Sequence, residues 1–264
     1  MNIKKNGISI FPYGDAGKPS VIFIHGFPFD HQMWNNQVSK FSSNYFCITY
    51  DVRGLGDSES GDGQYTMELF VDDLEMIANE MKLNKPVLCG FSMGGYISLR
   101  AVERMEEKFG GLILCDTKSG SDNNEGKINR ASAIKRINDL GVKKYVGEFI
   151  PNCFSESSLI NKKDLVKKMI SESEYFSSTG LKGCLLAMAA RTDTTEHLSK
   201  IQIPSLILCG EEDNITTPDI MMGMADKIHN SEFYTIPKAG HLSLVENSDA
   251  VNKHIENFLK KIKL

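Results

Sequence analysis

The stretch VLCGFSMGG, residues 87–95, places a serine between two glycines directly after an apolar run, and the segment YISLRAV, residues 96–102, follows it. This order predicts a buried strand, a sharp turn and a helix. Gly90 and Gly94 suit such a turn, because strand and helix approach so closely that a side chain at either position would clash. Ser92 would then project from the turn, with the amino end of the helix beneath it. The pattern alone is weak evidence, and its place between a strand and a helix is what indicates a nucleophilic serine.

Outward from this turn, short apolar runs typical of buried strands alternate with segments of helical period. Runs such as VIFI, residues 21–24, are apolar throughout, as expected for parallel strands covered on both faces. Strands are predicted at residues 8–13, 20–25, 46–50, 86–89, 111–115, 205–209 and 232–236. Helices are predicted at residues 66–82, after Thr217 and from 249 to 261. The sequence therefore predicts an α/β fold with a mostly parallel central sheet flanked by helices.

The pattern changes after residue 115, because no convincing strand follows until residue 205. The segment opens with the polar, turn-rich stretch KSGSDNN, residues 118–124, as a boundary should. Helices are predicted at residues 126–140, 143–149, 156–171 and 175–191. We therefore expect a core formed by residues 1–118 and 197–264, with a helical lid at residues 119–196 inserted into it.

Composition limits the classes of function. With 264 residues and a formal net charge of -4, the chain has no basic field that would attract nucleic acid. No apolar run is long enough to span a bilayer, and neither a membrane anchor nor a signal peptide is predicted. Six cysteines without C-x-x-C spacing favour buried free thiols and a cytoplasmic protein. A small molecule is the expected partner.

A serine hydroxyl needs a base, and six histidines could supply it. His241 lies just past the last predicted strand, where loops from the carboxyl ends of parallel strands gather. His25 also ends a strand, but it precedes Gly26 and is placed to shape a loop. Helical or polar surroundings favour surface or structural roles for the other four, which are His31, His197, His229 and His254. His241 is the predicted base.

The base in turn needs a carboxylate to hold its tautomer. Asp213 follows the predicted strand at 205–209 and is the preferred acid. Glu211 and Glu212 are rivals on position, and Asp116, after the strand at 111–115, could reach the same histidine from a neighbouring strand.

Two backbone amides are needed to stabilise an oxyanion. The turn at Ser92 offers the amide of Met93. The second donor is expected in HGFP, residues 25–28, which follows the strand at 20–25. Phe27 is the predicted donor, since Gly26 lets the backbone approach and Pro28 has no N–H group.

These motifs together resemble the alpha/beta-hydrolase fold superfamily over essentially the whole chain, and within it small capped carboxylesterases and enol-lactonase-like hydrolases. The similar stretches are HGFPFDHQMW (25–34), DVRGLGDS (51–58), GFSMGG (90–95), GEEDNITTP (210–218) and AGHLSLVENS (239–248). The resemblance implies a catalytic triad of Ser92, Asp213 and His241, with Phe27 and Met93 as oxyanion donors. It also implies a helical cap inserted after the sixth strand, at residues 119–196.

The resemblance further implies a serine esterase that cleaves carboxylic esters or lactones of small to medium, partly apolar substrates, as a monomer or homodimer. Neither a metal nor an organic cofactor is expected. Relatives with an aspartate nucleophile are disfavoured by Ser92. Leu242 stands where carbon-carbon bond hydrolases often carry a bulky aromatic residue, and HGFP differs from the Asn-Ser type loop of many lactonases. Phe29, Phe149 and Met188 are the candidate substrate-binding residues.

Three alternatives stay open at this point. A carbon-carbon bond hydrolase and an acyltransferase of the same fold would use the same residues. A ligand receptor on the hydrolase fold would keep them for slow or single turnover.

Overall fold

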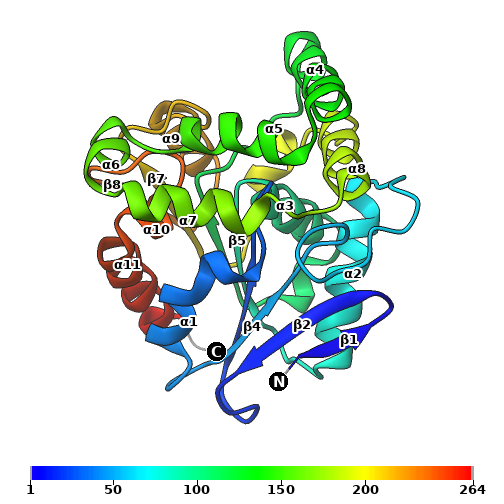
Figure 1. The fold of residues 1–264 in the computed structure, drawn as a ribbon. Coiled ribbons are helices and arrows are strands. Elements are labelled where there is room, and N and C mark those ends of the chain that lie inside the picture. Colours follow the sequence, from blue (N-terminus) through cyan, green and yellow to red (C-terminus); the bar gives the residue numbers. More distant parts are fainter. Residues whose placement is uncertain (1, 263–264) are drawn as a thin grey trace.

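The computed structural model describes residues 2–262, which form one mostly parallel sheet with helices around it (Figure 1). The strands are β1 (Ile3–Lys5), β2 (Ile8–Tyr13), β3 (Ser20–Ile24), β4 (Phe46–Tyr50), β5 (Val87–Phe91), β6 (Gly111–Cys115), β7 (Ser205–Gly210) and β8 (Ser231–Ile236). Their order in the sheet is β1-β2-β4-β3-β5-β6-β7-β8. The β1–β2 and β2–β4 pairs are antiparallel, and all later pairs are parallel.

The predicted α/β fold class is confirmed, and all seven predicted strands are present with ends displaced by at most two residues. Every residue of β3 to β7 is buried, as expected for strands covered on both faces. The first strand, IKK, was not predicted, because it contains a single apolar residue and pairs at the sheet edge.

Helices cover the sheet on its two faces. On one side α2 (Met67–Glu80) packs against α3 (Met93–Met105), and elsewhere α1 (Asn35–Phe41) contacts α11 (Ser248–Lys261). Helix α9 (Pro218–Ala225) contacts β7 and β8. The α2 sequence follows the expected pattern, because the Thr66 side chain caps it by accepting from Leu69 N and its apolar face is buried.

Between β6 and β7 the described chain has helices and no strand. They are α4 (Asn124–Leu140), α5 (Val142–Phe149), α6 (Glu156–Asn161), α7 (Lys163–Ser173) and α8 (Ser178–Ala189). These helices lie at the end of the sheet away from both chain ends (Figure 1). We refer to residues 119–196 as the insertion.

The prediction of one helix at residues 156–171 is wrong. The chain leaves the helical conformation at Lys162, with φ -123°, and α7 begins at the next residue. The Lys162 ammonium donates to the carbonyl oxygen of Glu246 in the C-terminal part of the chain, so a tertiary contact holds the residue at which the two helices meet. The last helix of the insertion starts three residues later than predicted, because Ser177 caps it by accepting from Gly180 N.

All six cysteines are buried and free, in agreement with their position in apolar runs. None of the helices described is long and apolar enough to cross a membrane.

Candidate active site

Ser92 occupies the sharp turn between β5 and α3. Its backbone has φ 50° and ψ -111°, a strained conformation that turns the chain directly from strand into helix. The Ser92 amide donates to Cys115 O at 3.0 Å, and the Thr117 hydroxyl donates to Ser92 O at 2.7 Å, so β6 holds the turn from one side. A Cβ atom at Gly94 would collide with the carbonyl oxygens of Ile24 and His25, which explains the glycine there.

Gly94→Ala should therefore lower the free energy of unfolding by about 2 kcal/mol or more, because the new methyl group meets backbone rather than a flexible side chain. Urea denaturation measures the change. Gly223→Ala is the matched control, since Gly223 lies in α9 with open space around it and should gain up to about 1 kcal/mol. Equal effects of the two substitutions would contradict close packing at the turn.

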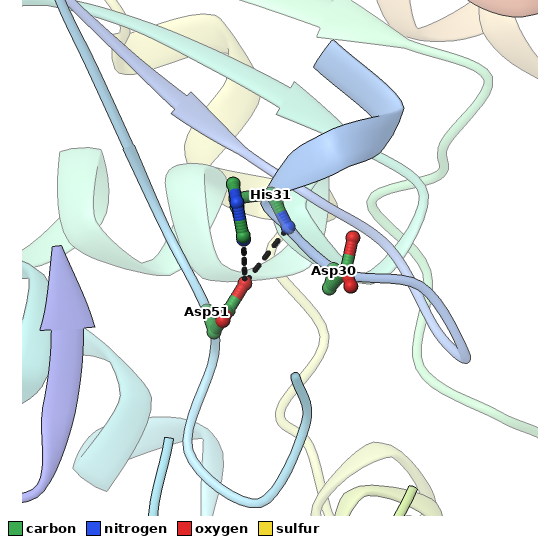
Figure 2. Close-up of side chains that lie close together, drawn as sticks. All are labelled: Asp30, His31 and Asp51. Carbon is green, nitrogen blue, oxygen red and sulfur yellow. Dashed lines mark hydrogen bonds and ion pairs between the residues drawn. The ribbon is translucent and has the colours of Figure 1, made fainter. Parts of the chain in front are cut away.

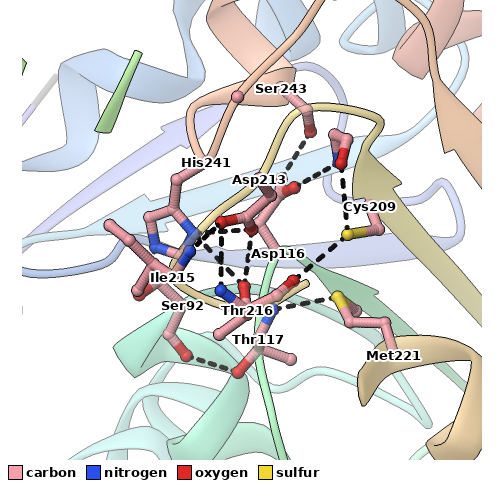
Figure 3. Close-up of polar contacts among 12 residues, drawn as sticks. Ser92, Asp116, Thr117, Cys209, Asp213, Ile215, Thr216, Met221, His241 and Ser243 are labelled. Carbon is pink, nitrogen blue, oxygen red and sulfur yellow. Dashed lines mark hydrogen bonds and ion pairs between the residues drawn. The ribbon is translucent and has the colours of Figure 1, made fainter. Parts of the chain in front are cut away.

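The structure brings Ser92, His241 and Asp213 together in one chain of hydrogen bonds (Figure 3). Ser92 Oγ lies 3.0 Å from His241 Nε2, and His241 Nδ1 lies 2.8 Å from Asp213 Oδ2. Asp213 and His241 are buried, at 2% and 5% exposed. The three side chains come from the loops after β5, β7 and β8, at the carboxyl ends of parallel strands.

Asp213 is held as a carboxylate by its own loop. Its Oδ1 accepts from the amides of Ile215 and Thr216, at 2.7 and 3.0 Å, and its Oδ2 accepts from the Thr216 hydroxyl at 2.6 Å. Burial by itself would raise the pKa of Asp213, but the neighbouring His241 and these hydrogen bonds outweigh it and lower the pKa below its ordinary value. An ionised Asp213 can therefore stabilise a protonated imidazole at His241.

Asp116, the alternative acid, lies close by but forms no hydrogen bond or ion pair with His241. Its carboxylate accepts from Gly210 N at 2.7 Å and from the Ser243 hydroxyl, so it connects the loops that carry Asp213 and His241 (Figure 3). Burial, and then the charge of Asp213, raise the pKa of Asp116 well above its ordinary value. The other two rivals, Glu211 and Glu212, are exposed.

The loop that contains Phe27 reaches the turn at Ser92. A Cβ atom at Gly26 would come within 3.0 Å of Ser92 Cβ and 2.7 Å of the Phe91 ring, so only glycine allows this approach. In the described chain neither the Phe27 amide nor the Met93 amide donates a hydrogen bond to another residue. Both amides are therefore free to donate, as the donors of an oxyanion hole must be.

His25 holds this loop through hydrogen bonds at both nitrogens of its ring. Val52 N donates to His25 Nε2 at 2.8 Å, so Nδ1 carries the proton and donates to Gly26 O at 2.9 Å. Complete burial lowers the pKa of His25 to about 4. The imidazole is thus a neutral structural group that connects the loops after β3 and β4.

The contribution of His25 to stability should consequently fall as the pH drops below 6.5, because the unfolded chain protonates His25 while the folded chain does so only near pH 4. Between pH 7 and pH 5.5 the expected loss from this residue is about 1 kcal/mol. Urea denaturation of the native protein and of His25→Asn at both pH values measures it, and the variant should lose less stability across the interval. Identical losses in the two proteins would contradict a neutral His25.

His31 forms a second buried cluster, with Asp30 and Asp51 (Figure 2). Asp51 Oδ1 accepts from the backbone amide and from Nδ1 of His31, at 2.8 and 2.7 Å, and its Oδ2 accepts from Asp57 N at 2.8 Å. Both oxygens of Asp30 accept from Gln32. The carboxylates are therefore already paired, and the cluster joins the end of the Phe27 loop to the loop after β4.

The three candidate substrate-binding residues lie in different places. Phe149 lines a cavity in the insertion and packs edge-on against Phe27, with ring centres 5.9 Å apart. Phe29 is 2% exposed and packs on Phe91, and Met188 is also 2% exposed in the core. Of the three, the structure places Phe149 at a cavity.

Glu246 is a site residue that the sequence analysis missed. Its Oε1 accepts from Gly240 N, next to His241, at 2.9 Å, and its Oε2 accepts from the amide and hydroxyl of Ser155, at 2.9 and 2.8 Å. The buried carboxylate thus joins the insertion to the loop that carries His241. An acidic residue at the end of the apolar run LSLV was the available signal.

The chain is similar to known proteins over most of its length. The family model described as alpha/beta hydrolase fold matches residues 19–248. The 3-oxoadipate enol-lactonase 2 of Acinetobacter baylyi is 26% identical over 253 residues, which cover 94% of this chain and 91% of that protein.

Two solved structures extend the comparison. A thermophilic esterase from Thermogutta terrifontis, solved with malate bound, superposes with a TM-score of 0.93 at 32% identity and covers 99% of this chain and 98% of its own. An enol-lactonase from Burkholderia xenovorans LB400 superposes with a TM-score of 0.90 at 23% identity. The match covers 98% of this chain and 100% of the enol-lactonase, which therefore shares the fold. The chain therefore belongs to the alpha/beta hydrolase fold family, with an esterase and enol-lactonases among its relatives.

Proposed function

We propose that this chain is a serine hydrolase that cleaves carboxylic esters or lactones of small to medium, partly apolar substrates. The observation that carries the proposal is the unbroken chain of contacts from Ser92 through His241 to Asp213, next to two unpaired amides. The esterase and enol-lactonase names of its relatives support the same class of substrate.

In the proposed reaction, His241 Nε2 takes the Ser92 proton as Oγ attacks the ester carbonyl carbon. The amides of Phe27 and Met93 stabilise the tetrahedral oxyanion, and Asp213 stabilises the imidazolium. The alcohol leaves with the proton from His241. Water then attacks the acyl-enzyme and gives a proton to the same histidine, which returns it to Ser92 Oγ as the bond to the acyl group breaks and the acid product leaves.

The proposed function also assigns roles to two parts of the chain, a core and an inserted cap. Residues 1–118 and 197–264 form the core that carries all five groups, and the insertion at 119–196 acts as a cap over them. The free, buried cysteines support a reducing cytoplasm as its location. The described side chains supply every proton transfer that the reaction needs.

A panel of p-nitrophenyl esters with increasing acyl length, combined with fluorophosphonate labelling, tests the function. We expect repeated turnover and one label on the peptide that contains Ser92. A single stoichiometric burst would favour a receptor over an enzyme. Transfer of the acyl group to an added alcohol or thiol in preference to water would favour an acyltransferase, and inertness toward every ester would overturn the proposal.

A further inference from the structure

The insertion contains a cavity of about 490 Å³ that the proposed mechanism has not used. It lies between α4, α5 and α8, with the loop after β6 at one side. Its lining combines apolar and aromatic side chains with three cations and with the carboxylates of Asp122 and Glu148. The residues that matter here are Lys118, Arg130, Arg136, Tyr145 and Phe149, and we call this space the α4–α5 cavity.

The cavity adjoins the candidate active site through its aromatic wall. The rings of Tyr145 and Phe149 stack with centres 5.7 Å apart. Both rings pack on Phe27, at 6.4 and 5.9 Å between centres. On another side, Lys118 follows Thr117, whose hydroxyl donates to Ser92 O. The cavity is therefore bordered by two rings that pack on Phe27 and by Lys118, the neighbour of a residue that contacts the turn at Ser92.

The cationic groups exceed the carboxylates that pair with them. Asp122 already has a buried partner in Arg191, at 3.0 Å, with both side chains 3% exposed. Lys118 and Arg130 also approach Asp122, at 3.5 and 3.1 Å. Arg136 pairs with Glu148, and so does Lys144, at 3.4 Å. Five cations thus share two carboxylates, and the cavity itself is lined by three of these cations and by both carboxylates.

Most of the hydrogen-bonding capacity of the two arginines is unused. Arg130 donates to Asp122 through Nε, and Arg136 donates to Glu148 through one terminal nitrogen. Within residues 2–262 the remaining guanidinium N–H groups have no protein acceptor. Burial raises the pKa of Tyr145 to about 12, so its hydroxyl remains a neutral donor beside these cations.

We propose that the α4–α5 cavity binds a carboxylate carried by the substrate, several bonds away from the ester that Ser92 attacks. Guanidinium groups bind carboxylates through paired N–H donors, and Arg130 is better shielded from water than the exposed Arg136. The aromatic wall would hold the apolar chain between the two groups. This inference rests on the proposed function and specifies it: the preferred substrates are esters or lactones that bear a free carboxylate.

Two arms of one experiment separate the positions that the carboxylate could have in the substrate. Monomethyl glutarate carries it on the acid side of the ester, and 4-acetoxybutanoate carries it on the alcohol side. Each is compared with its neutral primary amide. In at least one arm we expect kcat/KM for the anion to exceed that for the amide about tenfold, with a preference that falls at high salt.

Arg130→Gln and Arg136→Gln should each lower kcat/KM for the anionic ester about fivefold or more, chiefly through KM. The same substitutions should change kcat/KM for the amide less than about twofold. Asp122 keeps Arg191 in the first variant, so the fold is preserved. Lys135→Gln is the matched control, because Lys135 is exposed on α4 and does not line the cavity. Equal turnover of the anionic ester and its neutral amide in both arms would overturn the inference. An Arg130→Gln variant that lowers kcat/KM for the anionic ester and for the amide by the same factor would also overturn it.

Calorimetric titration with glutarate gives a readout that does not depend on turnover. We expect the native protein and Ser92→Ala to bind this dianion alike, and Arg130→Gln to bind it at least fivefold more weakly. Hydrolysis of neutral esters at Ser92 without glutarate binding would overturn the anion site alone. Glutarate binding that depends on Arg130, in a protein that hydrolyses no ester, would overturn the proposed function alone.

Discussion

Ser92→Ala will lower kcat for p-nitrophenyl acetate by about 10⁴-fold or more. The substitution removes the one oxygen that lies 3.0 Å from His241 Nε2, and no other hydroxyl of the described chain contacts that nitrogen. The amides of Phe27 and Met93 remain, so a small rate above the uncatalysed background should persist. Steady-state kinetics measures the loss, and labelling by fluorophosphonate should disappear with it.

A serine on the surface of the insertion provides the control. Ser171 is exposed on α7, where its hydroxyl donates to Lys168 O, and Ser171→Ala should keep kcat and labelling within about twofold. Thermal unfolding of Ser92→Ala should occur near that of the native protein, which separates lost chemistry from lost structure. Hydrolysis by Ser92→Ala at the native rate would show that Ser92 is not the nucleophile.

The central strands and the turn at Ser92 could be predicted because local sequence determines them. Strands such as β3 and β7 are apolar throughout, and the turn needs glycine at positions that any single sequence displays. The placement of His241 was also predictable, since the parallel sheet brings the loops after its strands to one edge.

The sequence favoured Asp213 but left Asp116 open as the acid, because both follow parallel strands at the same edge. Their side-chain directions depend on backbone geometry that no local pattern reveals. Asp116 has a positive φ of 45°, which turns its carboxylate toward Gly210 N and the Ser243 hydroxyl. Asp213 lies two residues farther along its own loop and meets the imidazole.

The arrangement of the insertion was beyond prediction for a related reason. Helices α5 and α7 are amphipathic on their own, whereas α4 and α8 are not, and the packing of all four depends on partners distant in the sequence. Glu246, more than eighty residues from α6, holds Ser155 and also accepts Lys162 at its carbonyl, where the predicted single helix breaks. The α4–α5 cavity likewise brings Lys118 next to residues of three helices.

Asp213→Asn should lower kcat/KM for ester hydrolysis by about 10³- to 10⁴-fold, and Asp116→Asn by less than about tenfold. An asparagine at position 213 has no charge to stabilise the imidazolium. Its amide group can also donate to His241 Nδ1 and so favour the wrong tautomer. The steady-state rates of the two variants across pH 5 to 9 measure the contrast.

The small effect expected at position 116 follows from its surroundings. Burial and the charge of Asp213 raise the pKa of Asp116 well above its ordinary value, so a neutral asparagine changes the charge there little. The asparagine oxygen can accept from Gly210 N, and its amide can donate to the Ser243 hydroxyl, which keeps the two loops joined. A loss in Asp116→Asn as large as in Asp213→Asn would reverse the assignment, because it would show that the imidazolium depends on the negative charge of Asp116. The observed 2.8 Å contact between Asp213 and His241 leads us to expect the opposite.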